Sequence, residues 1–174
     1  MNAARHVYVG LGSNIGRSRE TLATAIGRLA ALGPVTGVSS LWRTAPRERT
    51  DQPDFLNAAA AIADPRWISD PLALLAELQG IERRCGRVER ARFGPRELDL
   101  DILLFSSMLA VVRLPALEVP HPRFRERRFA LEPLAELAPD ERDPASHRTV
   151  AELLEDVRDQ RAEKVAGGDW WTHG

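Results

Sequence analysis

Alternating acidic and aliphatic residues form the segment around which the chain is organised. Residues 97–102 read Glu-Leu-Asp-Leu-Asp-Ile, the period-two pattern of a β-strand with one apolar face. The aliphatic positions that we expect in a core are Leu98, Leu100, Ile102 and Leu104. Asp99 and Asp101 then lie on the opposite face, roughly 6.5 Å apart along the strand.

Asp99 and Asp101 are therefore candidate metal ligands. Two carboxylates this close repel each other unless an opposite charge lies near both. Mg²⁺ suits such a site, because it takes carboxylate oxygens and keeps other positions for water and phosphate. The alternative is a solvated strand face balanced by arginines, and the alternation by itself leaves both interpretations open.

The N-terminal segment predicts a strand followed by a helix. An apolar run at residues 7–11 stops at the glycine-containing turn 12–16. Ser18 is expected to cap a helix that ends at Gly33. The apolar stripe of this helix consists of Leu22, Ile26 and Leu29.

The next segments are less uniform in pattern. Residues 35–43 are β-branched and aromatic, as in a strand, and a polar loop with prolines follows. Residues 55–63 fit a helix by their alanine content, or a strand by their length between prolines. Propensity does not decide between these two structures.

A second helix has clear boundaries. Asp70 is expected as its N-cap, Pro71 as its first residue and Gly86 just past its end. Its apolar stripe consists of Leu74, Leu78, Ile81 and Cys85. Cys85 is therefore interpreted as a core residue and not as a nucleophile.

Arginines gather on both sides of the acidic strand. Residues 83–96 contain six arginines and one glutamate. Further on, His121 stands between two prolines that fix its direction, and four arginines follow at residues 123–128. Because arginine binds phosphate oxygens in pairs, this pattern indicates a phosphate-binding cleft with a metal at one end. His121 is either a ligand-binding residue or an ordinary surface or core residue.

Composition limits the class of protein. A length of 174 residues suits one domain, and a net charge of −1 argues against a general nucleic-acid or membrane-surface binder. The sequence shows no membrane-spanning apolar run and no signal-peptide pattern, and Cys85 is the only cysteine. We therefore expect a cytoplasmic protein.

Near the C-terminus, Thr149 and Glu152 predict a capping box that starts a helix. Trp170 either packs on the body of the protein or lies in a loose tail.

Five ordered blocks resemble the 6-hydroxymethyl-7,8-dihydropterin pyrophosphokinase family. They are Gly-Leu-Gly-Ser-Asn at 10–14, Trp-Arg-Thr at 42–44, Asp-Gln-Pro-Asp-Phe-Leu-Asn-Ala-Ala at 51–59, Phe-Gly-Pro-Arg-Glu-Leu-Asp-Leu-Asp-Ile at 93–102 and Val-Pro-His at 119–121. The resemblance covers about residues 7–139. It implies one domain over 1–174 with an α/β, ferredoxin-like fold, in which helices pack on one face of an antiparallel sheet and substrate loops lie on the other. It makes residues 55–63 a strand and leaves 140–174 as a C-terminal helical extension.

The resemblance also implies a reaction. Pyrophosphate moves from ATP to the hydroxymethyl oxygen of 6-hydroxymethyl-7,8-dihydropterin, AMP is released, and two Mg²⁺ ions are held by Asp99 and Asp101. The partners are these small molecules only, with no nucleic acid and no membrane, and we expect a monomer.

Motif positions imply the remaining site residues. The expected catalytic arginines are Arg87 and Arg96. The expected nucleotide-binding residues are Gln79, Glu82, Arg92, Ile102, His121 and Arg127. The expected pterin-binding residues are Thr44, Ala45, Arg47, Phe55, Asn57 and Phe129, of which the two phenylalanines would stack on the pterin ring.

Some positions depart from the family pattern. Phe93 stands where tryptophan is usual, and residues 47–50 (Arg-Glu-Arg-Thr) replace a loop expected to be rich in glycine and proline. Ala116 and Glu118 replace a basic residue and a hydroxyl. Two other functions were considered, another two-metal phosphoryl-transfer enzyme and a non-catalytic ferredoxin-like RNA-binding module. The near-neutral charge counts against the RNA-binding module.

Overall fold

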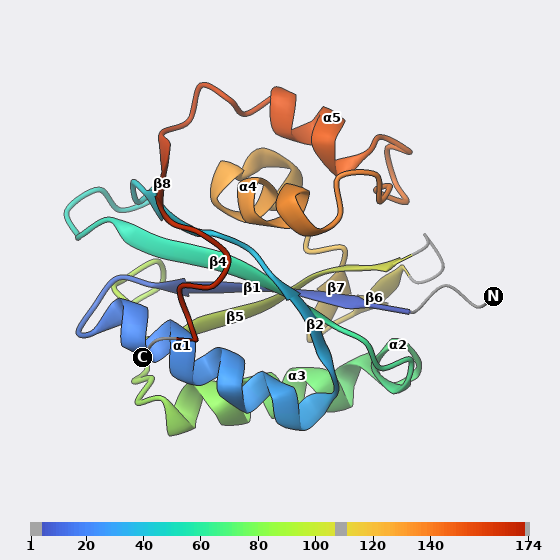
Figure 1. Ribbon diagram of the computed structural model, residues 1–174, viewed down its shortest axis with the longest axis horizontal. Coiled ribbons are helices and arrows are strands. Elements are labelled where there is room, and N and C mark those ends of the chain that lie inside the picture. Colours follow the sequence, from blue (N-terminus) through green and yellow to red (C-terminus); the bar gives the residue numbers. More distant parts are fainter. Residues whose placement is uncertain (1–4, 107–110, 173–174) are drawn as a thin grey trace.

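A six-stranded antiparallel sheet forms the centre of the molecule (Figure 1). The computed structural model describes residues 5–106 and 111–172. The sheet order is β5-β1-β4-β3-β8, with β2 also paired to β4. Its strands are β1 (Val7–Ser13), β2 (Val35–Val38), β3 (Leu41–Thr44), β4 (Phe55–Ile62), β5 (Asp99–Phe105) and β8 (Ala162–Ala166). A separate hairpin consists of β6 (Val112–Leu114) and β7 (Leu117–Val119).

Helices cover both faces of this sheet. The helices are α1 (Ser18–Leu29), α2 (Arg66–Ser69), α3 (Pro71–Arg84), α4 (Arg128–Leu137) and α5 (Val150–Glu155), with short 3-10 turns at Ala30–Leu32 and Phe124–Glu126. In Figure 1, α1 and α3 lie on one side of the sheet, and α4 and α5 lie on the other. The prediction that helices pack on one face was therefore wrong. The mixed α/β class and the antiparallel sheet are confirmed, and the finer ferredoxin-like assignment stays a prediction.

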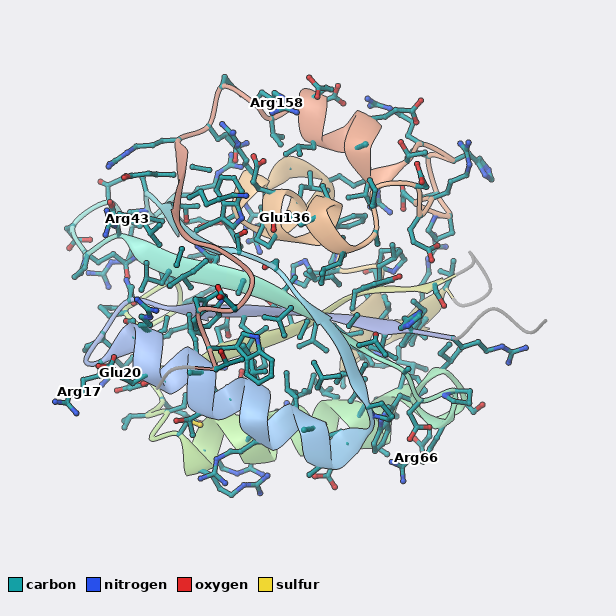
Figure 2. All side chains as sticks on the ribbon, viewed as in Figure 1. Arg17, Glu20, Arg43, Arg66, Glu136 and Arg158 are labelled. Atoms are coloured by element: carbon teal, nitrogen blue, oxygen red, sulfur yellow. The ribbon has the colours of Figure 1, made fainter. Side chains whose placement is uncertain are left out.

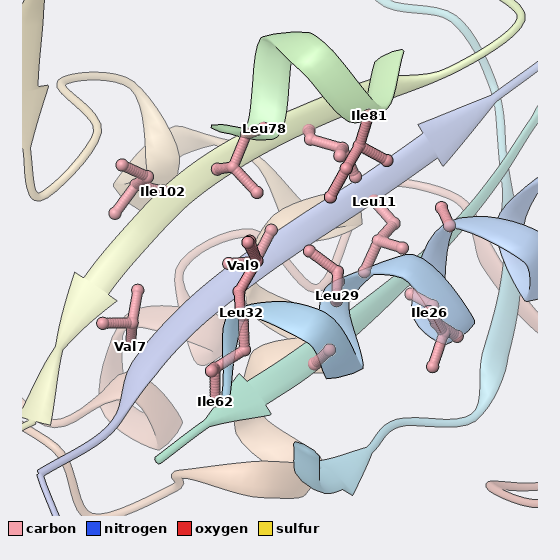
Figure 3. Close-up of a cluster of buried hydrophobic side chains, with 14 of the residues drawn as sticks. Val7, Val9, Leu11, Ile26, Leu29, Leu32, Ile62, Leu78, Ile81 and Ile102 are labelled. Atoms are coloured by element: carbon pink, nitrogen blue, oxygen red, sulfur yellow. The ribbon is translucent and has the colours of Figure 1, made fainter. Parts of the chain in front are cut away.

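Two apolar cores explain why both faces are covered. On β1, Val9 and Leu11 pack in the core beneath α1 and α3, whereas Tyr8 packs in the core beneath α4 and α5. The first core is shown in Figure 3. Its labelled side chains are Val7, Val9, Leu11, Ile26, Leu29, Leu32, Ile62, Leu78, Ile81 and Ile102. The second core depends on the C-terminal third of the chain, whose apolar positions the sequence interpretation had not assigned to a sheet face.

A register shift separates the predicted core residues of β5. Leu98, Leu100 and Ile102 are buried in the first core, as predicted. Leu104 is buried too, but it packs in the second core. The pairing of β1 with β5 shifts between Tyr8 and Val9, so that one extra β5 residue is inserted there and the alternation reverses. The prediction for Leu104 was right about burial and wrong about the face.

The helix boundaries follow local capping. Asp70 accepts a hydrogen bond from the Ala73 amide (3.1 Å) and Pro71 begins α3, as predicted. Gly86 has φ of 86°, the left-handed conformation that ends a helix. Ser18 does not cap α1. It is the first helical residue, and its hydroxyl accepts a hydrogen bond from the Ser13 hydroxyl (2.9 Å).

Side-chain hydrogen bonds divide residues 35–43 into two strands. Ser39 and Ser40 lie between β2 and β3, and the Ser39 hydroxyl accepts from the Ala59 amide (2.8 Å). Residues 55–62 form strand β4 and not a helix, as the resemblance implied. Glu136 of α4, labelled in Figure 2, accepts hydrogen bonds from the Ser40 amide (2.9 Å) and the Trp42 indole (2.7 Å), which joins α4 to this part of the sheet.

The C-terminal segment contains a strand as well as a helix. The capping box of Thr149 and Glu152 is present and starts α5. Residues 162–166 then form β8, which pairs with β3 at the edge of the sheet. Trp170 is buried and donates from its indole to the Ser39 carbonyl (2.9 Å), so it packs on the body. Among the described residues, no helix is long and apolar enough to cross a membrane.

Candidate active site

A pocket of about 380 Å³ opens on the sheet face that also carries α4. Its floor is formed by β1, β4 and β5, and its walls come from loop 45–54, loop 86–98 and residues 121–130. Gly10 and Gly12 lie in the middle of the floor. The pocket thus lies on the sheet face opposite α1 and α3, and that face is shared with α4.

Strand register places an acid and an amide on either side of the floor glycines. Gly12 pairs with Asp99 on one side and with Asn57 on the other, and Gly10 pairs with Asp101 and Ala59. A Cβ atom on Gly12 would lie 3.1 Å from the Asn57 Oδ1 atom. Glycine at this position therefore keeps open the space that connects the carboxylates to Asn57.

Arginines hold the Asp99 carboxylate. Arg87 donates to Asp99 Oδ1 (3.0 Å) and Arg96 donates to Oδ2 (2.6 Å). Arg87 also forms an ion pair with Glu82, whose Oε1 accepts from the Leu100 amide (2.7 Å). Glu82 is buried, and burial raises its pKa. The two predicted catalytic arginines are thus already positioned beside a predicted metal ligand.

Asp101 is near the charges of Arg96 and Arg127, but these only partly offset burial and the Asp99 charge. Burial and the neighbouring Asp99 charge raise its pKa to about 7. Neither of its oxygens accepts a hydrogen bond from a residue in the described part of the chain. A carboxylate in this situation favours a proton or a cation.

The oxygen donors fit Mg²⁺ better than a softer metal. Within residues 5–106 and 111–172, no group of three or more His, Cys, Asp or Glu side chains is placed to hold an ion. Mg²⁺ is commonly bound by one or two carboxylates, with phosphates and water completing its coordination. Asp99 and Asp101 match that arrangement, because both line the pocket and their carboxylates share one face of β5.

The other end of the pocket is aromatic and amide-lined. Phe55 and Phe129 line it, as do Thr44 and its neighbours Ala45 and Arg47. Asn57 is buried and donates from Nδ2 to the Thr44 hydroxyl (2.8 Å). All six residues predicted to bind pterin therefore line one pocket. Two aromatic faces and a fixed amide are suited to a flat, polar-edged ring.

The predicted nucleotide-binding residues are divided. Arg92, His121 and Arg127 line the pocket. Burial, followed by the Arg127 charge, lowers the pKa of His121. Gln79 is exposed on α3, and the Ile102 side chain lies in the core beneath α1 and α3, so the structure does not bring these two side chains to the pocket. Glu82 contacts the site through Arg87.

A hydrogen-bond network links three loops around the pocket and was not predicted. Asn14 donates to Gln52 Oε1 (3.0 Å) and to the Pro53 carbonyl (3.0 Å), and it accepts from the Arg96 amide (2.8 Å). Gln52 in turn donates to the Phe93 carbonyl (2.9 Å). Both polar residues lie within the resembling blocks, which was the available signal. Glu48 and Arg123 also line the pocket. Arg123 belongs to the arginine cluster noted in the sequence, whereas no ligand-binding role had been predicted for Glu48.

Comparison with known proteins decides the family. Residues 8–139 match the model of 7,8-dihydro-6-hydroxymethylpterin-pyrophosphokinase (HPPK). The chain belongs to the HPPK family. A curated HPPK relative, the 2-amino-4-hydroxy-6-hydroxymethyldihydropteridine pyrophosphokinase of Pseudomonas aeruginosa, is 43% identical over 165 residues, covering 94% of this chain and 98% of the relative. The Bacillus subtilis protein of the same name is 44% identical over 132 residues, covering 75% of this chain and 76% of that protein.

Solved structures agree on the fold. The HPPK-DHPS protein of Plasmodium falciparum matches with a TM-score of 0.68 at 15% identity, over 89% of this chain and 46% of that chain. At 15% identity this structural similarity shows the fold alone. The family and its named relatives confirm that this chain is a pyrophosphokinase of the HPPK type, and they give no support to an RNA-binding module.

Proposed function

We propose that this pocket transfers pyrophosphate from ATP to the hydroxymethyl oxygen of 6-hydroxymethyl-7,8-dihydropterin. The alcohol oxygen bonds to the β-phosphorus, and the bond breaks between that phosphorus and the oxygen that bridges it to the α-phosphorus. AMP leaves with this oxygen, and the alcohol proton is released. The proposal includes two Mg²⁺ ions and a monomer that acts on these small molecules in the cytoplasm, with no nucleic-acid or membrane partner.

One observation carries this proposal. A single pocket joins a carboxylate and arginine end to an aromatic and amide end. The first end suits a metal-bound triphosphate and the second suits a pterin ring. The floor glycines between them leave no side chain to separate two substrates that must meet in line.

The proposed role of each residue follows from its position in the pocket. Asp99 and Asp101 would hold Mg²⁺, which supplies charge neutralisation on the phosphates when bound. Arg87 and Arg96 reach the same point and would bind phosphate oxygens, most strongly as charge develops in the transition state. Asn57 would orient the pterin edge, while Phe55 and Phe129 would exclude water around the ring.

A product assay tests the proposal. The protein is mixed with ATP, Mg²⁺ and 6-hydroxymethyl-7,8-dihydropterin, and nucleotides are separated by chromatography. We expect AMP in the presence of the pterin and none without it or with the Asp101→Asn variant. ADP as the product would show that a different phosphorus is attacked. Absence of any product would contradict the proposed reaction.

A further inference from the structure

The carboxylate of Glu48 occupies two arginines of the pocket. Its Oε1 atom lies 2.9 Å from Arg123 Nη1 and 3.2 Å from Arg127 Nη2. All three side chains line the pocket that holds Asp99 and Asp101. We call this arrangement the Glu48 clamp. A carboxylate oxygen between two guanidinium groups takes the place that a phosphate oxygen would take.

The arginine side of the Glu48 clamp is fixed. Arg127 is the N-cap residue of α4, and its carbonyl accepts from the amides of Ala130 (3.1 Å) and Leu131 (3.0 Å). Its guanidinium carbon lies 5.4 Å from the centre of the Phe129 ring, and the side chain is 13% exposed. Separation of Glu48 from Arg127 therefore requires movement of the loop, while the Arg123 side chain is 41% exposed and less confined.

Arg127 keeps a donor that Glu48 does not satisfy. Its Nε atom is buried and has no hydrogen-bond partner among the described residues. A buried donor without a partner is unfavourable. A phosphate group carries more acceptor oxygens than one carboxylate, so it can bond to this donor and to the terminal nitrogens together.

The loop side of the Glu48 clamp is exposed and lightly attached. Residues 47–51 are exposed. Beside the two ion pairs of Glu48, Arg47 donates to the Glu126 carbonyl, and Gln52 holds the far end of the loop. The loop thus lies against the Phe124–Glu126 turn through a small number of polar contacts.

Charge makes Glu48 and a phosphate mutually exclusive at this position. Burial raises the pKa of Glu48, but the charges of Arg127 and Arg123 outweigh burial and hold that pKa below its usual value. Glu48 is therefore an anion at neutral pH. Two anions at one arginine pair repel each other, so binding of one requires departure of the other.

We propose that Glu48 sets the affinity of the pocket for nucleotide: its carboxylate occupies the anion site of Arg123 and Arg127, and ATP phosphate must displace it and so release loop 45–51. This inference rests on the proposed function, because it takes ATP as the ligand. It concerns residues 47–50, the part of the loop whose charge departs from the family pattern.

Calorimetric binding of a non-hydrolysable ATP analogue with Mg²⁺ tests the inference. We expect Glu48→Gln to bind the analogue about 3- to 30-fold more tightly than the wild type, since two partly exposed ion pairs no longer oppose binding. Glu126→Gln is the matched control. It removes the same charge from the neighbouring turn, where the Glu126 carboxylate lies 3.9 Å from Arg123 and, among the described residues, forms no ion pair with Arg127. We expect the Glu126→Gln affinity within about twofold of wild type.

Hydrogen exchange of the nucleotide-free protein gives a second readout that does not depend on ATP. Amides of residues 45–51 should exchange faster in Glu48→Gln than in the wild type or in Glu126→Gln. Unchanged exchange, or nucleotide binding that is equal or weaker in Glu48→Gln, would overturn the inference. If the wild type made AMP normally, that result would leave the proposed function standing. If the wild type bound no nucleotide, the proposed function and the inference would both fail.

Discussion

On strand β5, neighbouring residues face opposite surroundings. Leu100 and Ile102 are 5% and 3% exposed and pack against the helices of the first core, whereas Asp99 and Asp101 face the pocket. The apolar face contributes to stability in proportion to the area it buries. The acidic face works against stability, because it holds two like charges close together. Substitutions on the two faces should therefore separate activity from stability.

The largest effect is expected on the acidic face. Asp99→Ala or Asp101→Ala should lower turnover by at least about 10³-fold, because the pocket would lose a ligand for the ion that neutralises phosphate charge. Circular dichroism should show an intact fold in both variants, and the pterin-dependent AMP assay measures turnover. Near-normal activity in either variant would remove that residue from the metal site.

Arg96→Ala should have the next largest effect. Loss of a charge that acts on the transition state typically lowers kcat by about 10²- to 10³-fold. Arg90→Ala is a suitable control, because Arg90 lies in the same loop and pairs with Glu97 (2.5 Å) without lining the pocket. We expect kcat of Arg90→Ala to stay within a few-fold of wild type. Equal losses in the two variants would mean that Arg96 acts only through loop structure.

The apolar face should show the reverse behaviour. Ile26 of α1 is fully buried in the first core (Figure 3), and Ile26→Ala should lower the free energy of unfolding by about 2–5 kcal/mol. Its kcat, measured well below the melting temperature, should stay near the wild-type value. Thr24→Ala, at an exposed position on the same helix, should change stability by less than about 0.5 kcal/mol. A large fall in kcat for Ile26→Ala would show that the two faces are coupled.

The smallest expected effect is an increase in stability, and it tests the same contrast between the acidic and apolar faces of β5. In chelator at pH 5, Asp101→Asn should raise the free energy of unfolding by about 1–2 kcal/mol, since it removes a half-buried like charge beside Asp99. The pKa of Asp101 is raised from 3.8 to about 7, so the folded wild type binds more protons than the unfolded chain between these values. Wild-type stability from this group therefore falls as pH rises from about 4 to 7. Denaturant melts should show a larger gain at pH 8 than at pH 5, and a gain independent of pH would contradict the shift.

Local signals in the sequence were sufficient for much of the fold. Asp70 with Pro71, and Thr149 with Glu152, predicted helix starts correctly because each signal is complete within four residues. Alternation predicted the faces of Leu100 and Asp101. The same alternation failed at Leu104, because the extra residue in the β1–β5 pairing is visible only once both strands are present. Which faces of the sheet the helices cover, and the pairing of β8, likewise depend on long-range contacts.

The candidate site, like the fold, could be predicted from the sequence only in part. The residues that motif positions predicted to bind pterin line one pocket together with the two predicted acidic ligands. Ile102 was assigned to the nucleotide although its side chain belongs to the apolar face of β5, which strict alternation already indicated. The sequence marked the unusual charge of residues 47–50, but it could not show that Glu48 pairs with Arg123 and Arg127, which lie about 75 to 80 residues away along the chain.

Strand β8 has a consequence for how the chain can be shortened. The match to the family ends at residue 139, but β3 is covered at the sheet edge by residues 162–166. A truncation after residue 140 would uncover a row of unpaired amides and carbonyls on β3 and would remove the Trp170 side chain that is buried beside Ser39. An open strand edge of this kind pairs readily with another chain. The family-matching portion expressed alone is therefore expected to self-associate through β3, whereas in the longer chain β3 is paired and the outer strand is β8, which carries the exposed charges of Glu163 and Lys164.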